Sequence, residues 1–222
     1  NQTVLPNGRR AFIDLGACEE ANEVLFDVQP QQEGDVFHAS PLQAGYLATA
    51  MVLLSFATAV AIYFDLLSRD SESRSEVVNI FSWVPVGDLQ IDMAFLVDPL
   101  SSVMLLFVTG IGSLIHLYSV GYMHGDPKFS KFFLYLNLFV FSMLMLVMGE
   151  NLLVTFLGWE GVGTCSYFLI SFWHTRESAA TAGKKAFVTN RVGDWGVMMA
   201  MFLAFGATGT LSYAGINHAA ES

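Results

Sequence analysis

The sequence predicts an all-α membrane protein, a polytopic bundle of about five transmembrane helices with a short extracytoplasmic β-hairpin. Its 222 residues are 54% hydrophobic and 14% charged, and the mean hydropathy is +0.51. This composition is too apolar for a soluble domain of this size. Several apolar runs are long enough to cross a bilayer core of about 30 Å, and one of them contains a single carboxylate, Glu160.

Charge and cysteine content exclude several function classes. The net charge of −10 arises mainly in the polar ends and loops, which argues against nucleic acid as a partner. Cys18 lies in the polar N-terminal segment and Cys165 inside an apolar run, so we expect the two thiols at different depths and unpaired. The sequence contains no zinc-ligand spacing, phosphate-binding glycine loop or Ser-His-Asp arrangement. We therefore expect neither a metal site nor soluble-enzyme chemistry.

Residues 1–41 read as a polar tail and residues 42–67 as the first transmembrane helix. The tail has no sustained helical or alternating period and no signal-peptide core, so we expect low order there. Because the chain begins with Asn1 rather than Met, we expect an internal or processed fragment. The apolar run that follows contains Asp65 near its end, which is expected at or near the membrane interface.

Residues 68–98 are expected to leave the membrane as an extracytoplasmic loop with a β-hairpin. Apolar and polar residues alternate from Leu89 to Phe95, which is the period of a half-buried strand. The segment from Pro85 to Asp88 supplies turn residues between the two arms. We expect the hairpin to cap one end of the helix bundle.

Residues 99–206 are expected to form four further transmembrane helices, and residues 207–222 a C-terminal tail. The predicted spans cover 100–123, 132–148, 151–173 and 184–205. Only Gly149 to Asn151 separates the second of these spans from the third. These two helices must therefore be antiparallel neighbours.

Lysine and arginine residues predict the orientation. Five lie in the loops 124–131 and 174–185, against two, Arg69 and Arg74, on the opposite side. Because cytoplasmic loops carry an excess of these residues, we expect the two loops on the cytoplasmic side. The hairpin and the C-terminus then face outside, and five spans place the N-terminal tail inside.

Glu160 is the principal candidate for a functional residue. It lies nine residues after Asn151, which places it about 14 Å deep at a rise of about 1.5 Å per residue. A charge at the bilayer centre costs on the order of 2.5–3.5 kcal/mol on insertion scales, so an ionisable residue at this depth indicates a function. The neighbouring Gly158, Gly161 and Gly163 permit close approach of another helix.

Arg191 and Asp194 on the last predicted helix are candidate partners of Glu160. They are three residues apart and therefore on one helix face. Burial favours the neutral form of a carboxyl group and a nearby cation favours the charged form, which is the opposition that a proton relay requires. The alternative is a permanent structural pair of Glu160 with Arg191. Lys185 and His116 are supporting candidates, whose structural alternatives are an interfacial anchor and a satisfied interior histidine.

Three stretches of sequence carry a resemblance to a known family. They are DPLSSVMLLFVTGIGSLIHLYSVGYM, the run from FFLYLNLF to GWEGVGTCSYFLISFW, and AATAGKKAFVTNRVGDWG. From about Phe81 to Gly215 the sequence resembles subunit L (chain 5) of bacterial respiratory NADH:quinone oxidoreductase, complex I, with an actinobacterial pattern. GWEGVG followed by K-AFV--NRVGD is distinctive of this antiporter-like family. Large subunits of multisubunit sodium/proton antiporters and of membrane-bound hydrogenases share much of the pattern and are the alternatives.

The resemblance implies a translocase subunit that couples electron transfer from NADH to quinone, elsewhere in the assembly, to proton translocation. Glu160 matches the central-helix glutamate of the family's half-channel. Arg191 and Asp194 match the polar pair on the following helix, and Lys185 matches a lysine of bacterial members. In the implied cycle, Glu160 controls the proton affinity of a lysine on a later helix.

The implied partners are the other membrane-arm subunits of complex I and the lipid bilayer of the bacterial cell (inner or plasma) membrane. This chain is expected to hold no cofactor, because NADH, FMN, iron–sulfur clusters and quinone bind to other subunits of that complex. Family members are longer bundles with a helix where residues 1–41 stand, and their pumping lysines lie on helices beyond Ser222. We therefore expect an N-terminal fragment that pumps nothing alone, and a structural fragment that serves assembly is the second alternative.

Overall fold

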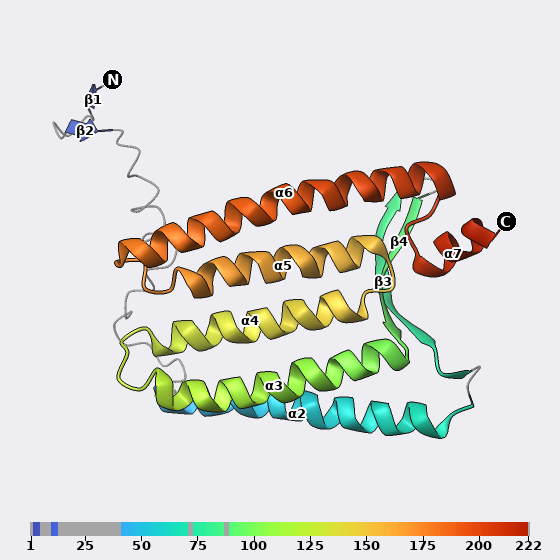
Figure 1. Ribbon diagram of the computed structural model, residues 1–222, viewed down its shortest axis with the longest axis horizontal. Helices are drawn as coiled ribbons and strands as arrows, with labels where there is room; N and C mark the ends of the chain where they lie inside the picture. The colour runs from blue at the N-terminus through green and yellow to red at the C-terminus, as the bar shows by residue number, and fades with distance from the viewer. Residues whose placement is uncertain (1, 5–9, 13–40, 71–72, 87–88, 222) are drawn as a thin grey trace. The chain divides into compact units, whose positions relative to one another are not determined.

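The computed structural model describes residues 2–4, 10–12, 41–70, 73–86 and 89–221. Contacts divide the chain into two compact units, residues 1–38 and 39–222. Among the described residues, the first unit holds two short strands, and the second holds the helices and a two-stranded sheet. Figure 1 shows the order of these elements along the chain.

The first unit differs from the predicted low order at six residues. Strands β1 (Gln2–Val4) and β2 (Arg10–Phe12) pair antiparallel, with Gln2 opposite Phe12. Strands of three residues are too short to give the sustained alternation that a sequence pattern requires. The rest of the prediction for residues 1–41 falls outside the described residues.

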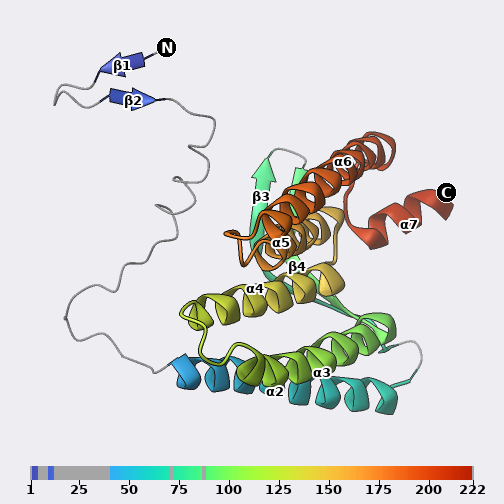
Figure 2. The same cartoon turned by 60° about the vertical axis from the view of Figure 1, so that its left-hand side comes forward.

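Four long helices lie side by side in the second unit. They are α2 (Pro41–Ser68), α3 (Pro99–Tyr122), α4 (Phe129–Met148) and α5 (Leu152–Ile170). Each is long and apolar enough to cross a membrane, as the sequence predicts. Figures 1 and 2 show α4 between α3 and α5, with α2 packed against α3. The antiparallel pairing predicted for α4 and α5 is confirmed.

Side-chain caps fix the starts of two of these helices. The Asp98 carboxylate accepts a hydrogen bond from the Ser101 N–H at 2.7 Å, and Ser101 Oγ accepts one from the Asp98 N–H at 2.8 Å. This reciprocal capping box begins α3. Asn151 Oδ1 accepts from the Val154 N–H at 2.9 Å and caps α5. The start predicted for the central helix is therefore correct within one residue.

Helix α6 (Glu177–Thr208) differs from the prediction in its start and in its polarity. The loop predicted up to Lys184 is helical from Glu177, because it contains three alanines and places an acid in the first turn. α6 is not among the four helices of the described chain that are apolar enough to span a membrane. Charged side chains, including Arg191 and Asp194, reduce its hydropathy. The described chain thus has four candidate spans by length and hydropathy, against about five predicted, and α6 is a further long helix packed along α5.

The predicted β-hairpin is present. Strand β3 (Glu76–Val86) pairs antiparallel with β4 (Leu89–Val97), with two irregularities in the register on the β3 side. β4 packs across the ends of α3, α4 and α5, so the hairpin caps the bundle as predicted. Among the residues of β4 from position 91 on, whose burial is described, Ile91 and Ala94 are buried. They are three residues apart, so the predicted alternation of buried and exposed residues holds only in part. The turn predicted from Pro85 to Asp88 lies partly outside the described residues.

A short helix, α7 (Tyr213–Glu221), lies within the predicted C-terminal tail. Gly209 ends α6 in the left-handed region at φ 72°, and its N–H donates to the Phe205 carbonyl at 2.8 Å. Ser212 Oγ accepts from the Gly215 N–H at 3.2 Å, as an N-cap side chain does. The sequence prediction missed α7 because nine residues carry too short a period.

A hydrophobic cluster rich in aromatic residues packs the end of the helix bundle opposite the hairpin. Its members are Val120, Met123, Phe129, Phe133, Tyr135 and Phe172. They flank the loops from α3 to α4 and from α5 to α6, and Figure 1 shows both loops at the same end. This is the end for which the lysine and arginine count predicts a cytoplasmic location.

Candidate functional site

An ion pair joins the central helix to α6. Arg191 Nη1 of α6 contacts Glu160 Oε2, which lies midway along α5. The Glu160 side chain is 24% exposed and that of Arg191 is 39% exposed, so the pair lies between the helices with one side open. The sequence left open whether Glu160 meets Arg191, and the structure brings them together.

Asp194 is the more deeply buried carboxylate of this cluster. Its side chain is 6% exposed, and its Oδ2 lies 3.5 Å from Arg191 Nη1, one turn along α6. Its Oδ1 accepts a hydrogen bond from Trp159 Nε1 of α5 at 2.7 Å. Trp159 was not predicted from the sequence as a residue of the site. The available signal was its position beside Glu160, since a tryptophan in an apolar helix needs an acceptor for its indole N–H.

One cation therefore serves two carboxylates. The Arg191 guanidinium stacks on the Phe187 ring at 4.6 Å, and Arg191 Nε is buried without a hydrogen-bond partner among the described residues. If Glu160 and Asp194 are both ionised, the cluster carries one excess negative charge. Charge inside a membrane is costly unless it is compensated. The arrangement therefore leaves one carboxylate charge without a matching cation among the described residues.

The glycines around Glu160 face two different helices. A Cβ atom at Gly158 would collide with the backbone nitrogen of Leu146, and one at Gly161 would lie 2.5 Å from Ser142 Oγ. Both contacts belong to α4, so these glycines allow the close α4–α5 approach that the sequence predicts. Gly163 faces α6, where Asn190 Nδ2 lies 3.6 Å from the corresponding position.

Lys185 lies apart from the ion pair. It is exposed on the first half of α6, six residues before Arg191, which is about 9 Å along a helix. It shares an open surface depression with Glu177, Ser178, Thr181 and Ala182. Within the described residues no ion pair involves Lys185.

His116 is fully buried in α3 and also lies outside the cluster. Its Nδ1 is 2.8 Å from the Gly112 carbonyl oxygen, one turn back along the helix. Since a carbonyl only accepts, Nδ1 carries the proton and Nε2 is left as an acceptor. That Nε2 has no hydrogen-bond partner among the described residues. The ring of Phe133 lies beside it, with centroids 6.1 Å apart.

Polar contacts continue from the cluster to the hairpin along one face of α5. Asn151, Thr155 and Trp159 are spaced four residues apart and so share that face. Each bonds to a different element: to β4 at 2.9 Å, to Tyr213 Oη of α7 at 2.8 Å, and to Asp194 of α6 at 2.7 Å. These three contacts attach α5 to every element on this side of it.

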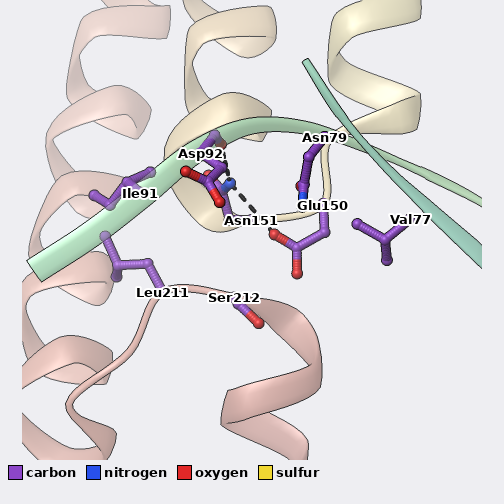
Figure 3. A pocket seen from close by; sticks show the side chains of 8 residues that line it. All are labelled: Val77, Asn79, Ile91, Asp92, Glu150, Asn151, Leu211 and Ser212. Atoms are coloured by element: carbon purple, nitrogen blue, oxygen red, sulfur yellow. Dashed lines mark hydrogen bonds between the residues drawn. The ribbon is translucent and has the colours of Figure 1, made fainter. Parts of the chain in front are cut away.

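A polar cavity of about 220 Å³ lies at the hairpin end of this face (Figure 3). It is lined by Val77, Asn79, Ile91, Asp92, Glu150, Asn151, Leu211 and Ser212. The loop between α4 and α5 holds its walls together, because the Glu150 N–H donates to the Ala94 carbonyl at 3.1 Å and the Leu152 N–H to the Leu211 carbonyl at 3.0 Å. The cavity lies at the start of α5, whereas Glu160 lies midway along it.

The predicted interfacial position of Asp65 is occupied by an exposed ion-pair network. Arg69 pairs with Asp65 at 2.7 Å, one turn away, and with Glu76 of β3 at 2.9 Å. The hydrogen bond that Arg69 donates to Glu76 and the charge of Asp65 raise the pKa of Arg69 above its ordinary value. Exposed ion pairs of this kind contribute little to the free energy of unfolding. The network therefore shows only that the end of α2 is polar.

Two family models match the chain. Residues 83–133 match "NADH-Ubiquinone oxidoreductase (complex I), chain 5 N-terminus", and residues 149–222 match "NADH:quinone oxidoreductase/Mrp antiporter, TM". NADH-quinone oxidoreductase subunit L of Mycobacterium tuberculosis is 51% identical over 170 residues, which cover 77% of this chain and 27% of that protein. The matched part of the chain belongs to the antiporter-like subunit L (chain 5) family. The resemblance predicted from the motifs is therefore confirmed.

Other members of the subunit L family extend the match beyond actinobacteria. Subunit L of Escherichia coli is 47% identical over 134 residues, 60% of this chain and 22% of that protein. The chloroplastic NAD(P)H-quinone oxidoreductase subunit 5 of Zygnema circumcarinatum is 41% identical over 172 residues, 78% of this chain and 24% of that protein. The chain thus spans about a quarter of the length of these relatives.

A solved structure supports the same fold. A chain in the structure of the Mrp complex from Dietzia sp. DQ12-45-1b matches with a TM-score of 0.67 and 25% identity, over 79% of this chain and 18% of that chain. The second family match contains Glu160, Arg191 and Asp194. With four candidate spans and membership of the subunit L family, the chain is a multi-pass membrane protein.

Proposed function

We propose that this chain is part of a proton-translocating membrane subunit of NADH:quinone oxidoreductase, in which Glu160 takes up and releases a proton inside the membrane. The observation that carries the proposal is the Glu160–Arg191 ion pair midway along the central apolar helix. The match to subunit L supports the same function.

The proposed relay works through exchange of the cation beside Glu160. Arg191 Nη1 lies within 3.5 Å of Asp194, so Arg191 keeps a carboxylate partner when Glu160 becomes neutral. Without an adjacent cation, desolvation favours the protonated form of Glu160, and a returning cation favours proton release. A shift of the guanidinium, or the approach of a lysine on a later helix, therefore moves one proton without any bond chemistry.

In this proposal Lys185 takes a supporting role and His116 a structural one. Lys185 is exposed near the predicted cytoplasmic end of α6, where its positive charge lies on the path between solvent and the Glu160 cluster in this proposal. His116 is enclosed in α3 with its Nδ1 on the Gly112 carbonyl, which fits a packing residue.

The proposed setting is the membrane arm of a bacterial complex I. In this setting the partners are the other membrane-arm subunits and the lipid bilayer. The chain itself holds no cofactor, and NADH, FMN, iron–sulfur clusters and quinone bind to other subunits. Redox energy released there reaches Glu160 as a change in the position of nearby charges.

The test is Glu160→Gln in the full-length parent subunit, assayed in membrane vesicles for NADH oxidation and proton pumping and on native gels for assembly. Gln keeps the shape of the side chain but carries no proton to transfer, so pumping should be lost while the complex still assembles. The matched control is Glu177→Gln, at the exposed start of α6. Normal pumping by the assembled Glu160→Gln variant would refute the relay.

A sodium/proton antiporter subunit is the second candidate function. It is favoured by the structural match to the Mrp complex and by the description of the second family model. The identity of 51% to subunit L against 25% to the Mrp chain favours the complex I subunit. Vesicles separate the two functions, because an antiporter responds to a sodium gradient without NADH and a complex I subunit requires NADH oxidation.

A further inference from the structure

We infer that Trp159 is a positioning residue, whose indole N–H holds the Asp194 carboxylate so that Arg191 is shared between Asp194 and Glu160. This inference rests on the proposed function of Glu160. It assigns to the tryptophan of the GWEGVG motif a role that composition and spacing alone do not suggest.

The two oxygens of Asp194 have separate partners. Oδ1 accepts from Trp159 Nε1 at 2.7 Å, and Oδ2 faces Arg191 Nη1 at 3.5 Å. The indole bond comes from α5 and the guanidinium from α6 itself, so the carboxylate is fixed from two helices. A buried carboxylate with two donors keeps its orientation.

The hydrogen bond explains the contact better than packing of the ring does. Trp159 is 47% exposed, whereas Asp194 is 4% exposed. The ring is only half covered, whereas the carboxylate is almost fully enclosed. Asp194 by contrast depends on every donor it has, since a buried charge without partners is costly.

Removal of the indole N–H therefore changes which carboxylate Arg191 serves. Asp194 Oδ1 then lacks a donor, and the guanidinium is the nearest group that can supply one. Movement of Arg191 toward Asp194 withdraws it from Glu160, which then retains its proton. Trp159 thus keeps Arg191 available to Glu160 without touching Glu160 itself.

The experiment compares Trp159→Phe, Asp194→Asn and the double variant in the full-length subunit within the assembled complex. The rate of NADH-driven proton pumping should fall roughly tenfold in Trp159→Phe, the order of magnitude by which loss of a hydrogen bond to a charged group shifts an equilibrium. The double variant should pump no less than Asp194→Asn alone. The infrared band of the Asp194 carboxylate should shift in Trp159→Phe, and this shift should be absent when Asn occupies position 194.

Two tryptophans provide matched controls. Trp173 Nε1 donates to Asp126 Oδ2 at 3.1 Å at the loop end of the bundle, so Trp173→Phe removes an equivalent bond away from the cluster. Trp195 is 60% exposed and adjacent to Asp194 in sequence. Both control variants should pump as the wild type does.

Distinct outcomes separate this inference from the proposed function. Unchanged pumping and an unchanged infrared band in Trp159→Phe, or additive losses in the double variant, would overturn the role of Trp159. The proposed proton relay through Glu160 would still be supported after such a result, provided that Glu160→Gln abolishes pumping in the same series. Should Trp159→Phe fail to assemble, replacement of Trp159 by 3-benzothienylalanine keeps the ring shape and removes only the N–H, and the same readouts then decide.

Discussion

Asn151 and Asp92 join the central helix to the hairpin. Asn151 Nδ2 donates to the Asp92 carbonyl oxygen at 2.9 Å, while its Oδ1 accepts from the Val154 N–H at 2.9 Å. One side chain, 3% exposed, thus caps α5 and holds β4 on its start. Because α5 begins at this cap, the junction determines the depth at which Glu160 lies.

Asn151→Ala is expected to lower the stability of the hairpin end by about 1–3 kcal/mol, because it removes a cap and leaves buried backbone groups without partners. The measurement is the thermal inactivation temperature of the complex in detergent, with limited proteolysis of the hairpin. Asn217→Ala, at an exposed position of α7, is the control and should have no effect. Equal inactivation temperatures for the two variants would contradict this role of Asn151.

Gly158→Ala is expected to disrupt α4–α5 packing more than Gly161→Ala. The Cβ at Gly158 would meet the Leu146 backbone, which cannot rotate away, whereas Ser142 Oγ opposite Gly161 can. Overpacking of this kind costs about 1–3 kcal/mol. Gly193→Ala is the control, since nothing lies within 4 Å of that position and alanine favours helix. Native gels measure assembly, and Gly158→Ala assembling as well as Gly193→Ala would show that this helix contact tolerates expansion.

Simultaneous replacement of Glu160 and Arg191 by Gln distinguishes a relay from a permanent structural pair. Arg191→Gln alone leaves a charged Glu160 without its cation, which costs about 3–5 kcal/mol for a buried pair and less here because the pair is partly open. The double variant removes both charges and should restore assembly. A relay predicts an assembled double variant without pumping, and a structural pair predicts that pumping returns with assembly.

The strong periodic and compositional signals of the sequence predicted most of the fold. The apolar runs located α2 to α5, alternation located β4, and the short connection before Asn151 required α4 and α5 to be neighbours. The start of α6 was mislocated, because the polar segment after Glu177 lacks the apolar face that marks a helix in a membrane. α7 was missed because one serine cap and nine residues give no detectable period.

The candidate site was predictable only as a set of charges. The intramembrane position of Glu160 and the spacing of Arg191 and Asp194 follow from the sequence. Their mutual contacts depend on how α5 rotates against α6, which sequence spacing within each helix does not determine. For the same reason the Trp159 hydrogen bond to Asp194 could not be derived, nor could the separation of Lys185 from the ion pair.

His116→Leu is expected to leave both assembly and pumping unchanged. His116 is buried with an unpartnered Nε2, and replacement of a poorly satisfied polar group by an apolar one of similar size is nearly neutral or stabilising. A histidine that relays protons needs an acceptor or donor on each nitrogen, and the described residues supply only the Gly112 carbonyl. The measurement is proton pumping per NADH oxidised, with His116→Asn as a variant that keeps a polar group in the same place. Loss of pumping in assembled complexes of both variants, neither of which has a side chain that titrates at position 116, would place His116 on the proton path.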